Sequence, residues 1–361
     1  MRVFIPVRPN RAYAQSATSH GMNTNDPTTI AKGLPQKTIF RQIEEMGLDY
    51  RIYFQDVPTA LMFKDIRHRD ARPRLHSMEK FFSDAAEGNL PDFTWLDPSY
   101  FDTAHKGATD QHPGHDFALG EALIGQVYAA VRSSPQWNET ALIITYDEHG
   151  GFFDHVAPME GVPNPDGINS LDDPFNYTRL GVRVPTIVVS PWVKKGLVVH
   201  GGDPNQPQYE HSSIAATVVH KIFKSRIPGH EPKYLTKRDA WAKTFEQIFS
   251  TVRIETHTVI DAVVEEEEEE EKPREDCPLT MPFSPLHRDL FPGTHPPLDG
   301  RQPLSDLHKD LIAIVYGAVT EMSQSGGGSG SAVLPAGIED WTEEDGAKYV
   351  ETQLKSYLLH Q

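Results

Sequence analysis

The pattern of hydrophobic and polar positions predicts short helices that alternate with single strands. Apolar residues recur at helical spacing in residues 38–46, 76–86, 116–131 and 212–223. Compact apolar or β-branched runs, which are typical of strands, occupy residues 50–54, 93–96, 141–146 and 182–190. This alternation favours an α/β fold with a mainly parallel sheet that helices cover on both faces. Before these elements, residues 1–6 suit a short strand, and the small polar residues of 9–25 predict a loop or the approach to a helix.

The composition of the chain changes after about residue 245, which predicts a main domain over 1–245 and a C-terminal region over 246–361. The run of seven glutamates at 265–271 repels itself and predicts an acidic linker. Two amphipathic helices are expected at 304–322 and 342–359, with a flexible glycine-serine spacer at 326–331. We expect this region to pack against the main domain.

Composition narrows the class of protein. The 361 residues include 34 basic and 51 acidic side chains, for a formal net charge of −17, which makes nucleic acid an improbable partner. No apolar run approaches the length of a membrane span, and the first residues lack the apolar core of a signal peptide. The single cysteine, Cys277, excludes an internal disulfide and thiolate zinc clusters.

The segment 141–156 carries the strongest chemical signal. An apolar strand is followed at once by Asp147, Glu148 and His149, then by a glycine pair, Asp154 and His155. Ligands of open α/β sheets bind just beyond the carboxyl ends of strands, and glycines allow the turn that lets neighbouring acids converge. Two hard oxygen donors there suit one divalent cation. The alternative interpretation is an acidic, solvated turn after a core strand.

Hydroxyl and histidine side chains elsewhere could complete a site for phosphoryl chemistry. Thr18 lies in a serine- and threonine-rich stretch, and such a hydroxyl needs a metal or a base to act as a nucleophile. His112 and His115 precede a predicted helix, as does His211, where a phosphate could be held or a leaving oxygen protonated. Capping turns are the alternative for each of these loops.

Seven segments in this order resemble the plant non-specific phospholipase C family, within the bacterial phosphoesterase and acid phosphatase group. The resemblance is strong over residues 1–245 and looser from Asp276 onward. It rests on Pro9-Asn10-Arg11, residues 16–21, 110–116, 146–156, 181–192, 210–214 and 235–241.

The resemblance implies an α/β/α sandwich similar to that of the alkaline phosphatases. It also implies hydrolysis of phosphatidylcholine or phosphatidylethanolamine at a membrane surface, giving diacylglycerol and a phosphorylated head group. Thr18 resembles the nucleophile, and Asp147 and Glu148 resemble the ligands of one divalent metal ion whose identity stays open. The further candidates are His115, His149, His155 and His211 for catalysis, and Asn10, Arg11 and His112 for substrate binding.

The family pattern begins with a strand that ends in a Glu-Asn-Arg-Ser-Phe-Asp-His-like segment, whose Glu and Asn complete the metal site. This sequence has no such segment, so we expect an N-terminally truncated chain with an exposed sheet edge. The resemblance suggests a membrane-associated or secretory-pathway location, although the signal region is missing here. Two alternatives to the phospholipase stay open: an acid phosphatase on phosphomonoesters, and an inactive remnant that binds lipid or phosphate.

Overall fold

The protein is described by a computed structural model that covers residues 7–24, 26–170, 174–200, 206–229, 231–251, 301–324 and 334–359. The expectations for residues 1–6, for the acidic linker 265–271, for Cys277 and for the spacer 326–331 fall outside these ranges. The helices of three or more residues within them are α1 (Val7–Ser16), α2 (Pro27–Lys32), α3 (Ile39–Glu45), η1 (Thr59–Met62), α4 (Lys64–Arg67), η2 (Arg69–Arg74), α5 (Met78–Glu87), α6 (Phe117–Ser133), η3 (Trp137–Glu139), α7 (Ser213–Thr217), the π-helix η4 (Val218–Phe223), α8 (Lys224–Arg226), α9 (Lys237–Trp241), η5 (Glu246–Ile248), α12 (Asp306–Gln324), η6 (Ile338–Asp340) and α13 (Glu343–Leu359).

Within these ranges, five strands form two small sheets. The first is parallel, with the order β2 (Leu75–Ser77), β1 (Tyr50–Phe54), β3 (Phe93–Asp97). The second is an antiparallel pair of β4 (Leu142–Thr145) and β5 (Thr186–Val189). The α/β class expected from the sequence is therefore confirmed.

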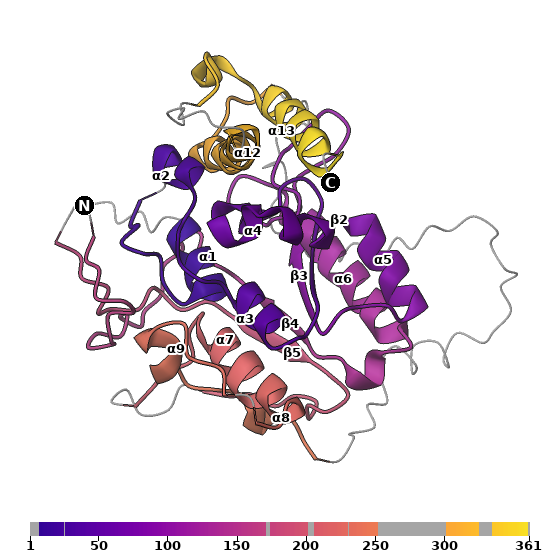
Figure 1. The fold of residues 1–361 in the computed structure, drawn as a ribbon, viewed down its shortest axis with the longest axis vertical. Coiled ribbons are helices and arrows are strands. Elements are labelled where there is room, and N and C mark those ends of the chain that lie inside the picture. Colours follow the sequence, from indigo (N-terminus) through magenta and orange to yellow (C-terminus); the bar gives the residue numbers. More distant parts are fainter. Residues whose placement is uncertain are drawn as a thin grey trace, which may run out of the picture.

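Strand β1 shows why helices cover both faces of the parallel sheet. Because successive side chains point to opposite faces, Tyr50, Ile52 and Phe54 enter one hydrophobic core while Tyr53 enters another. The first core also takes side chains from α3, α12 and α13, and the second takes side chains from α5 and α6. Figure 1 shows α5 and α6 on one side of the strands, with α12 and α13 at the top of the view.

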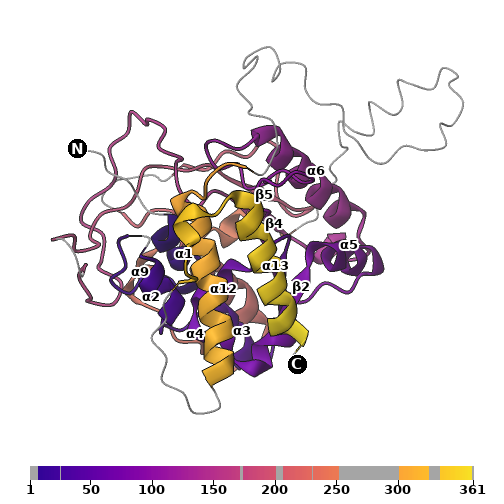
Figure 2. The same ribbon diagram turned by 90° about the horizontal axis from the view of Figure 1, so that it is seen from above.

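The C-terminal helices belong to the same packing as the start of the chain. Leu311, Ile312 and Val315 of α12 are fully buried in a core shared with Ile30 and Leu61. Figure 2 shows α12 and α13 side by side across the top of the molecule, and the two helices are in direct contact. The expected helices over 304–322 and 342–359, and their packing on the main part of the chain, are confirmed.

Two expectations are wrong. Residues 7–16 form helix α1 rather than a loop, because its buried positions are small or polar (Ala12, Ala14, Gln15 and Ser16) and give no apolar periodicity. The apolar strand after residue 141 does not join the parallel sheet. All four residues of β4 are half-buried, and its one partner among the described strands is the antiparallel β5.

Most other boundaries agree with the sequence. Asp116 caps α6 by accepting a hydrogen bond from the backbone N–H of Ala118 at 2.9 Å, as its position predicts. Thr38 caps α3 in the same way through Arg41 N–H. No helix in the described part of the chain is long and apolar enough to cross a membrane.

Candidate phosphoester site

A cavity of about 370 Å³ lies where β4 ends, and it gathers several of the predicted site residues. Gly150 and Gly151 adopt φ values of +64° and +77°, which form the tight turn that the glycine pair predicted. The turn is closed by the N–H of Phe152, which donates to the carbonyl of His149 at 3.0 Å. The candidate residues lining the cavity are Arg11, His112, Asp147, Glu148 and His149.

Arg11 and Asp147 form the ion pair at the centre of this site. The Nε–H of Arg11 donates to Oδ2 of Asp147 at 2.7 Å, and the Asp147 side chain also accepts from the N–H of Glu148. Burial opposes the charge on Arg11, but Tyr100, against whose ring it packs, and Asp147 raise its pKa above the ordinary value. Its Nη1 is buried without a hydrogen-bond partner among the described residues, which is a costly arrangement that a bound acceptor would relieve.

Glu148 lies beside two histidines of the cavity. Its Oε2 accepts from the N–H of Gly150 at 2.7 Å and lies 3.4 Å from Nδ1 of His149. Burial, with a smaller contribution from Asp147, raises the pKa of the Glu148 carboxyl. His112 donates from Nδ1 to the carbonyl of Pro113 at 2.9 Å, and this bond does not involve its other ring nitrogen, Nε2.

Thr18 lies at the end of α1 and does not line this cavity. It is buried, and its hydroxyl donates to Oδ2 of Asp166 at 2.6 Å while accepting from the N–H of His20 at 2.9 Å. The flanking residues Ala17 and His20 have φ values of +58° and +53°, a backbone conformation that is uncommon for residues other than glycine. A hydroxyl fixed against a carboxylate on a strained turn is an arrangement found for activated nucleophiles.

The remaining candidates lie outside the cavity lining. His115 binds Oδ1 of Asp110 through Nδ1 at 2.7 Å, and His155 is exposed beside Asp154. His211 lies with Nε2 at 3.2 Å from the carbonyl of Tyr146, just before α7. Asn10 is half-buried on α1.

Sequence reasoning missed several charged residues of this region. Arg183 lines the cavity and pairs with Asp154, whose pKa it holds below the ordinary range. Asp166 is the partner of Thr18, and His308 and Glu343 of the C-terminal helices lie beside His115. Arg183 lies in the segment 181–192, but nothing in that segment marks its pairing with Asp154. Asp166, His308 and Glu343 stand in none of the segments of the resemblance, and each meets its partner only through the fold.

A larger cavity of about 580 Å³ lies elsewhere, over β1 and α5. Most of its charged residues are already paired with one another: Arg51 and Lys80 both bind Asp84, and Arg74 binds Asp49. With these charges satisfied internally, that cavity offers less to a phosphate than the cavity beside Arg11.

The geometry defines an acid- and histidine-lined site at the end of a strand in an α/β protein, the setting of a phosphoesterase. A family model described as the phosphoesterase family matches residues 1–224, and the chain belongs to this family. The resemblance to the plant non-specific phospholipases C is confirmed by comparison with curated proteins.

Three relatives illustrate the similarity. The chain is 47% identical over 283 residues to non-specific phospholipase C6 of Arabidopsis thaliana, covering 77% of this chain and 50% of the relative. It is 47% identical over 280 residues to non-specific phospholipase C1 of the same plant, covering 76% and 48%. It is 29% identical over 171 residues to phospholipase C B of Mycobacterium tuberculosis, covering 44% and 29%. The chain thus spans about half the length of the plant relatives.

Proposed function

We propose that the chain hydrolyses glycerophospholipids, such as phosphatidylcholine or phosphatidylethanolamine, to diacylglycerol and a phosphorylated head group. The observation that carries this proposal is Arg11, which lines the cavity beside a pair of carboxylates and whose buried Nη1 has no hydrogen-bond partner among the described residues. The names of the plant relatives support phospholipids as the substrate class.

The charges of the cavity indicate why a cation would be needed. Asp147 and Glu148 by themselves repel a phosphate, and Arg11 neutralises only one of them. Two adjacent carboxylates are hard donors that suit a divalent ion, so the residues present fit one metal held by Asp147 and Glu148. When bound, such an ion would polarise a phosphoryl oxygen. Arg11 would then bind a second oxygen and orient the phosphorus.

Histidines supply the proton transfers in this proposal. His112 and His149 line the cavity, where one would hold a phosphoryl oxygen and the other would protonate the departing diacylglycerol oxygen. His149 is the better-placed proton donor, because Oε2 of Glu148 lies 3.4 Å from its Nδ1 and helps to orient the ring. His115, His155 and His211 have supporting roles outside the cavity lining.

Thr18 is the proposed nucleophile, with Asp166 as its base. The hydroxyl oxygen forms a bond to phosphorus as its proton passes to Asp166, and the bond between phosphorus and the diacylglycerol oxygen breaks. Water then cleaves the phosphothreonine and releases the phosphorylated head group. Because Thr18 does not line the cavity, this step requires Thr18 and its base Asp166 to come within reach of the phosphorus together.

The proposal also includes the type of α/β sandwich and a membrane surface as the place where the substrate is met. Helices on both faces of the parallel sheet support an alkaline-phosphatase-like sandwich over residues 1–245, with 246–361 as the C-terminal region. Phe152 and Phe153 are 63% and 92% exposed beside the cavity. Such apolar side chains suit a substrate presented at a membrane surface.

The test compares two substrates with matched variants. Purified chain supplied with divalent metal is assayed for diacylglycerol release from phosphatidylcholine vesicles and for hydrolysis of p-nitrophenyl phosphate. We expect lipid turnover that falls at least about a hundredfold in Asp147→Asn and is unchanged in Glu139→Gln, an exposed acid outside the site. Turnover of the monoester alone would identify an acid phosphatase, and vesicle binding without turnover of either substrate would identify an inactive remnant.

A further inference from the structure

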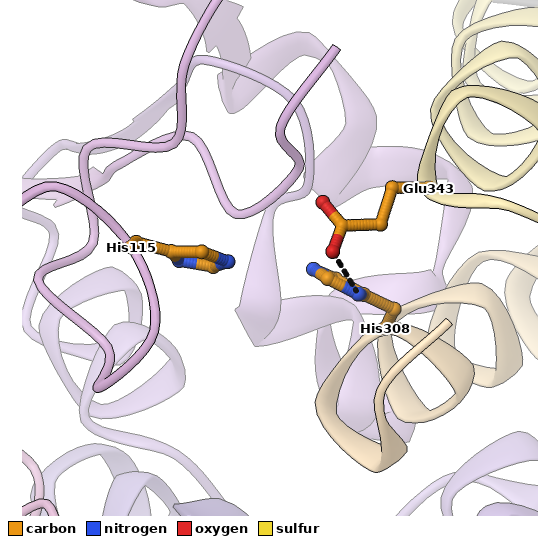
Figure 3. A group of neighbouring side chains, drawn as sticks. All are labelled: His115, His308 and Glu343. Carbon is orange, nitrogen blue, oxygen red and sulfur yellow. Dashed lines mark ion pairs between the residues drawn. The ribbon is translucent and has the colours of Figure 1, made fainter. Parts of the chain in front are cut away.

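A second cluster of ionisable groups lies where the C-terminal helices meet the cavity wall. His115, His308 and Glu343 each place one ligand atom within 4.8 Å of the others, and within the described ranges they are the one such group of three. Figure 3 shows the three side chains converging from the loop before α6, from α12 and from the start of α13. All three side chains are at least 91% buried, with exposures of 8%, 1% and 9%.

His115 is held with one nitrogen aimed at the cluster. Its Nδ1–H donates to Oδ1 of Asp110 at 2.7 Å, which fixes the tautomer and leaves the Nε2 lone pair free. A carboxylate behind a histidine in this way is the usual support of a metal-binding imidazole, because it orients the ring and increases its basicity.

His308 and Glu343 are also oriented by hydrogen bonds to the backbone. Nε2 of His308 donates to the carbonyl of Tyr100 at 2.8 Å. Its Nδ1, on the side of Glu343, accepts from the N–H of Ser305 at 3.3 Å and lies 3.1 Å from the Ser305 hydroxyl. One oxygen of Glu343, Oε2, accepts from the N–H of Asp102 at 2.9 Å, and the other lies 3.7 Å from Nδ1 of His308. His115 and Glu343 therefore each use one polar atom to orient the other, whereas a metal ion bound at Nδ1 of His308 would replace its contacts with Ser305.

Charge balance also favours a cation at this position. A buried carboxylate is costly unless a positive charge compensates it, and Glu343 faces two imidazoles that use their N–H groups elsewhere. A divalent ion would be balanced by Glu343 together with Asp110 behind His115. Four-coordinate bonds near 2.0–2.1 Å set ligand atoms about 3.4 Å apart, so the cluster, whose ligand atoms lie within 4.8 Å of one another, would contract by up to about 1.4 Å on binding.

We propose that His115, His308 and Glu343 bind a zinc-class transition metal ion that fastens the C-terminal helices to the wall of the phosphoester cavity. Two imidazoles and one carboxylate form a common three-residue zinc ligand set, with a fourth position for water. This ion is distinct from the cation proposed at Asp147 and Glu148, and the inference does not depend on the proposed function.

Asp110 connects the proposed metal site to the phosphoester cavity. Asp110 lines the cavity and holds His115, so one side chain joins the two places. Its Oδ1 also accepts from the N–H of His112, a residue of the cavity lining. Occupancy of the cluster would therefore stiffen the loop that presents His112, and it would tie that loop to α12 and α13.

The experiment separates the two proposed ions. The full chain carrying Asp147→Asn and Glu148→Gln is stripped with chelator and titrated calorimetrically with Zn²⁺, with Mg²⁺ as a hard-cation comparison. We expect one Zn²⁺ per chain, a rise in the thermal midpoint with Zn²⁺, and no comparable effect of Mg²⁺. When Co²⁺ replaces Zn²⁺ in the same double variant, we expect the intense visible absorption of a four-coordinate cobalt ion.

Variants of the cluster complete the test. In that background, His308→Gln and Glu343→Gln should each weaken Zn²⁺ binding at least about tenfold and abolish the cobalt absorption. His220→Gln, a change at another buried histidine, should leave both unchanged. Circular dichroism checks that each variant is folded. Failure of the parent protein to bind Zn²⁺, or equal binding in both cluster variants and the control, would overturn the proposal.

Discussion

The hydroxyl of Thr18 donates a 2.6 Å hydrogen bond to Asp166, a residue 148 positions later in the chain. Ser16 accepts from the side-chain amide of Gln36, which also donates to the carbonyl of Thr18, so the turn around this hydroxyl is fixed from several sides. This pairing gives the proposed nucleophile a base.

The first prediction concerns this pair. Thr18→Val should reduce phospholipid turnover at least about a thousandfold, because no oxygen remains to attack phosphorus, whereas Thr18→Ser should retain measurable activity. Asp166→Asn should lower kcat by about a hundredfold and leave KM nearly unchanged, since it removes the proton acceptor. Steady-state kinetics on vesicles measure both. Full activity in Thr18→Val would remove Thr18 from the mechanism.

The second prediction concerns Arg11. Arg11→Lys keeps the positive charge beside Asp147 but removes Nη1, the guanidinium nitrogen that has no hydrogen-bond partner among the described residues. We expect kcat/KM to fall by about 10- to 100-fold. The matched control is Arg226→Lys, an exposed arginine paired with Asp92, which should behave as the parent protein. An equal effect of the two substitutions would contradict a role for Arg11 in phosphate binding.

The third prediction tests the packing of α12 against α2. A Cβ atom at Gly317 would lie 2.1 Å from the carbonyl oxygen of Ala31, so the two helix backbones are too close for any side chain there. Gly317→Ala should lower the free energy of unfolding by about 1–3 kcal/mol despite the better helix propensity of alanine. Urea unfolding measures the difference. Gly181→Ala, where the added atom meets nothing within 4 Å, should change stability by less than about 0.5 kcal/mol.

The fourth prediction concerns pH. His220 is stacked on Tyr234 with ring centroids 3.8 Å apart, and burial, with Lys224 and Lys221 nearby, lowers its pKa to about 4. The unfolded chain therefore takes up this proton first, near pH 6.5, so the contribution of neutral His220 to stability is lost as pH falls from about 6.5 to about 4.

His220→Gln should remove that loss. The stability of the variant relative to the parent protein should rise by on the order of 2 kcal/mol between pH 7 and pH 4.5, as urea unfolding at each pH would measure. Burial raises the pKa of the neighbouring Asp239 to about 6, which acts in the opposite direction, but Asp239 is present in both proteins and cancels in the comparison. A constant stability difference across this range would contradict the prediction.

Local signals in the sequence determined much of the secondary structure. Strand β1 occupies the predicted residues 50–54, and Asp116 caps α6 where the capping preference placed it. The glycines after Glu148 form the turn that their conformational freedom allows. These features depend on residues within a few positions of one another, so the order of the amino acids is enough to specify them.

Tertiary structure decided the rest, because the contacts join residues that are far apart in the chain. Helix α1 is stabilised by burial of small and polar side chains, which leave no hydrophobic period to detect. The partner of Thr18 comes from a distant loop, and His115 meets His308 and Glu343 only after α12 and α13 pack onto the main part of the chain. The sequence alone determined which chemical groups were available and the family to which they belong. Folding decided which of those groups share a cavity, since only packing brings such distant side chains within bonding distance.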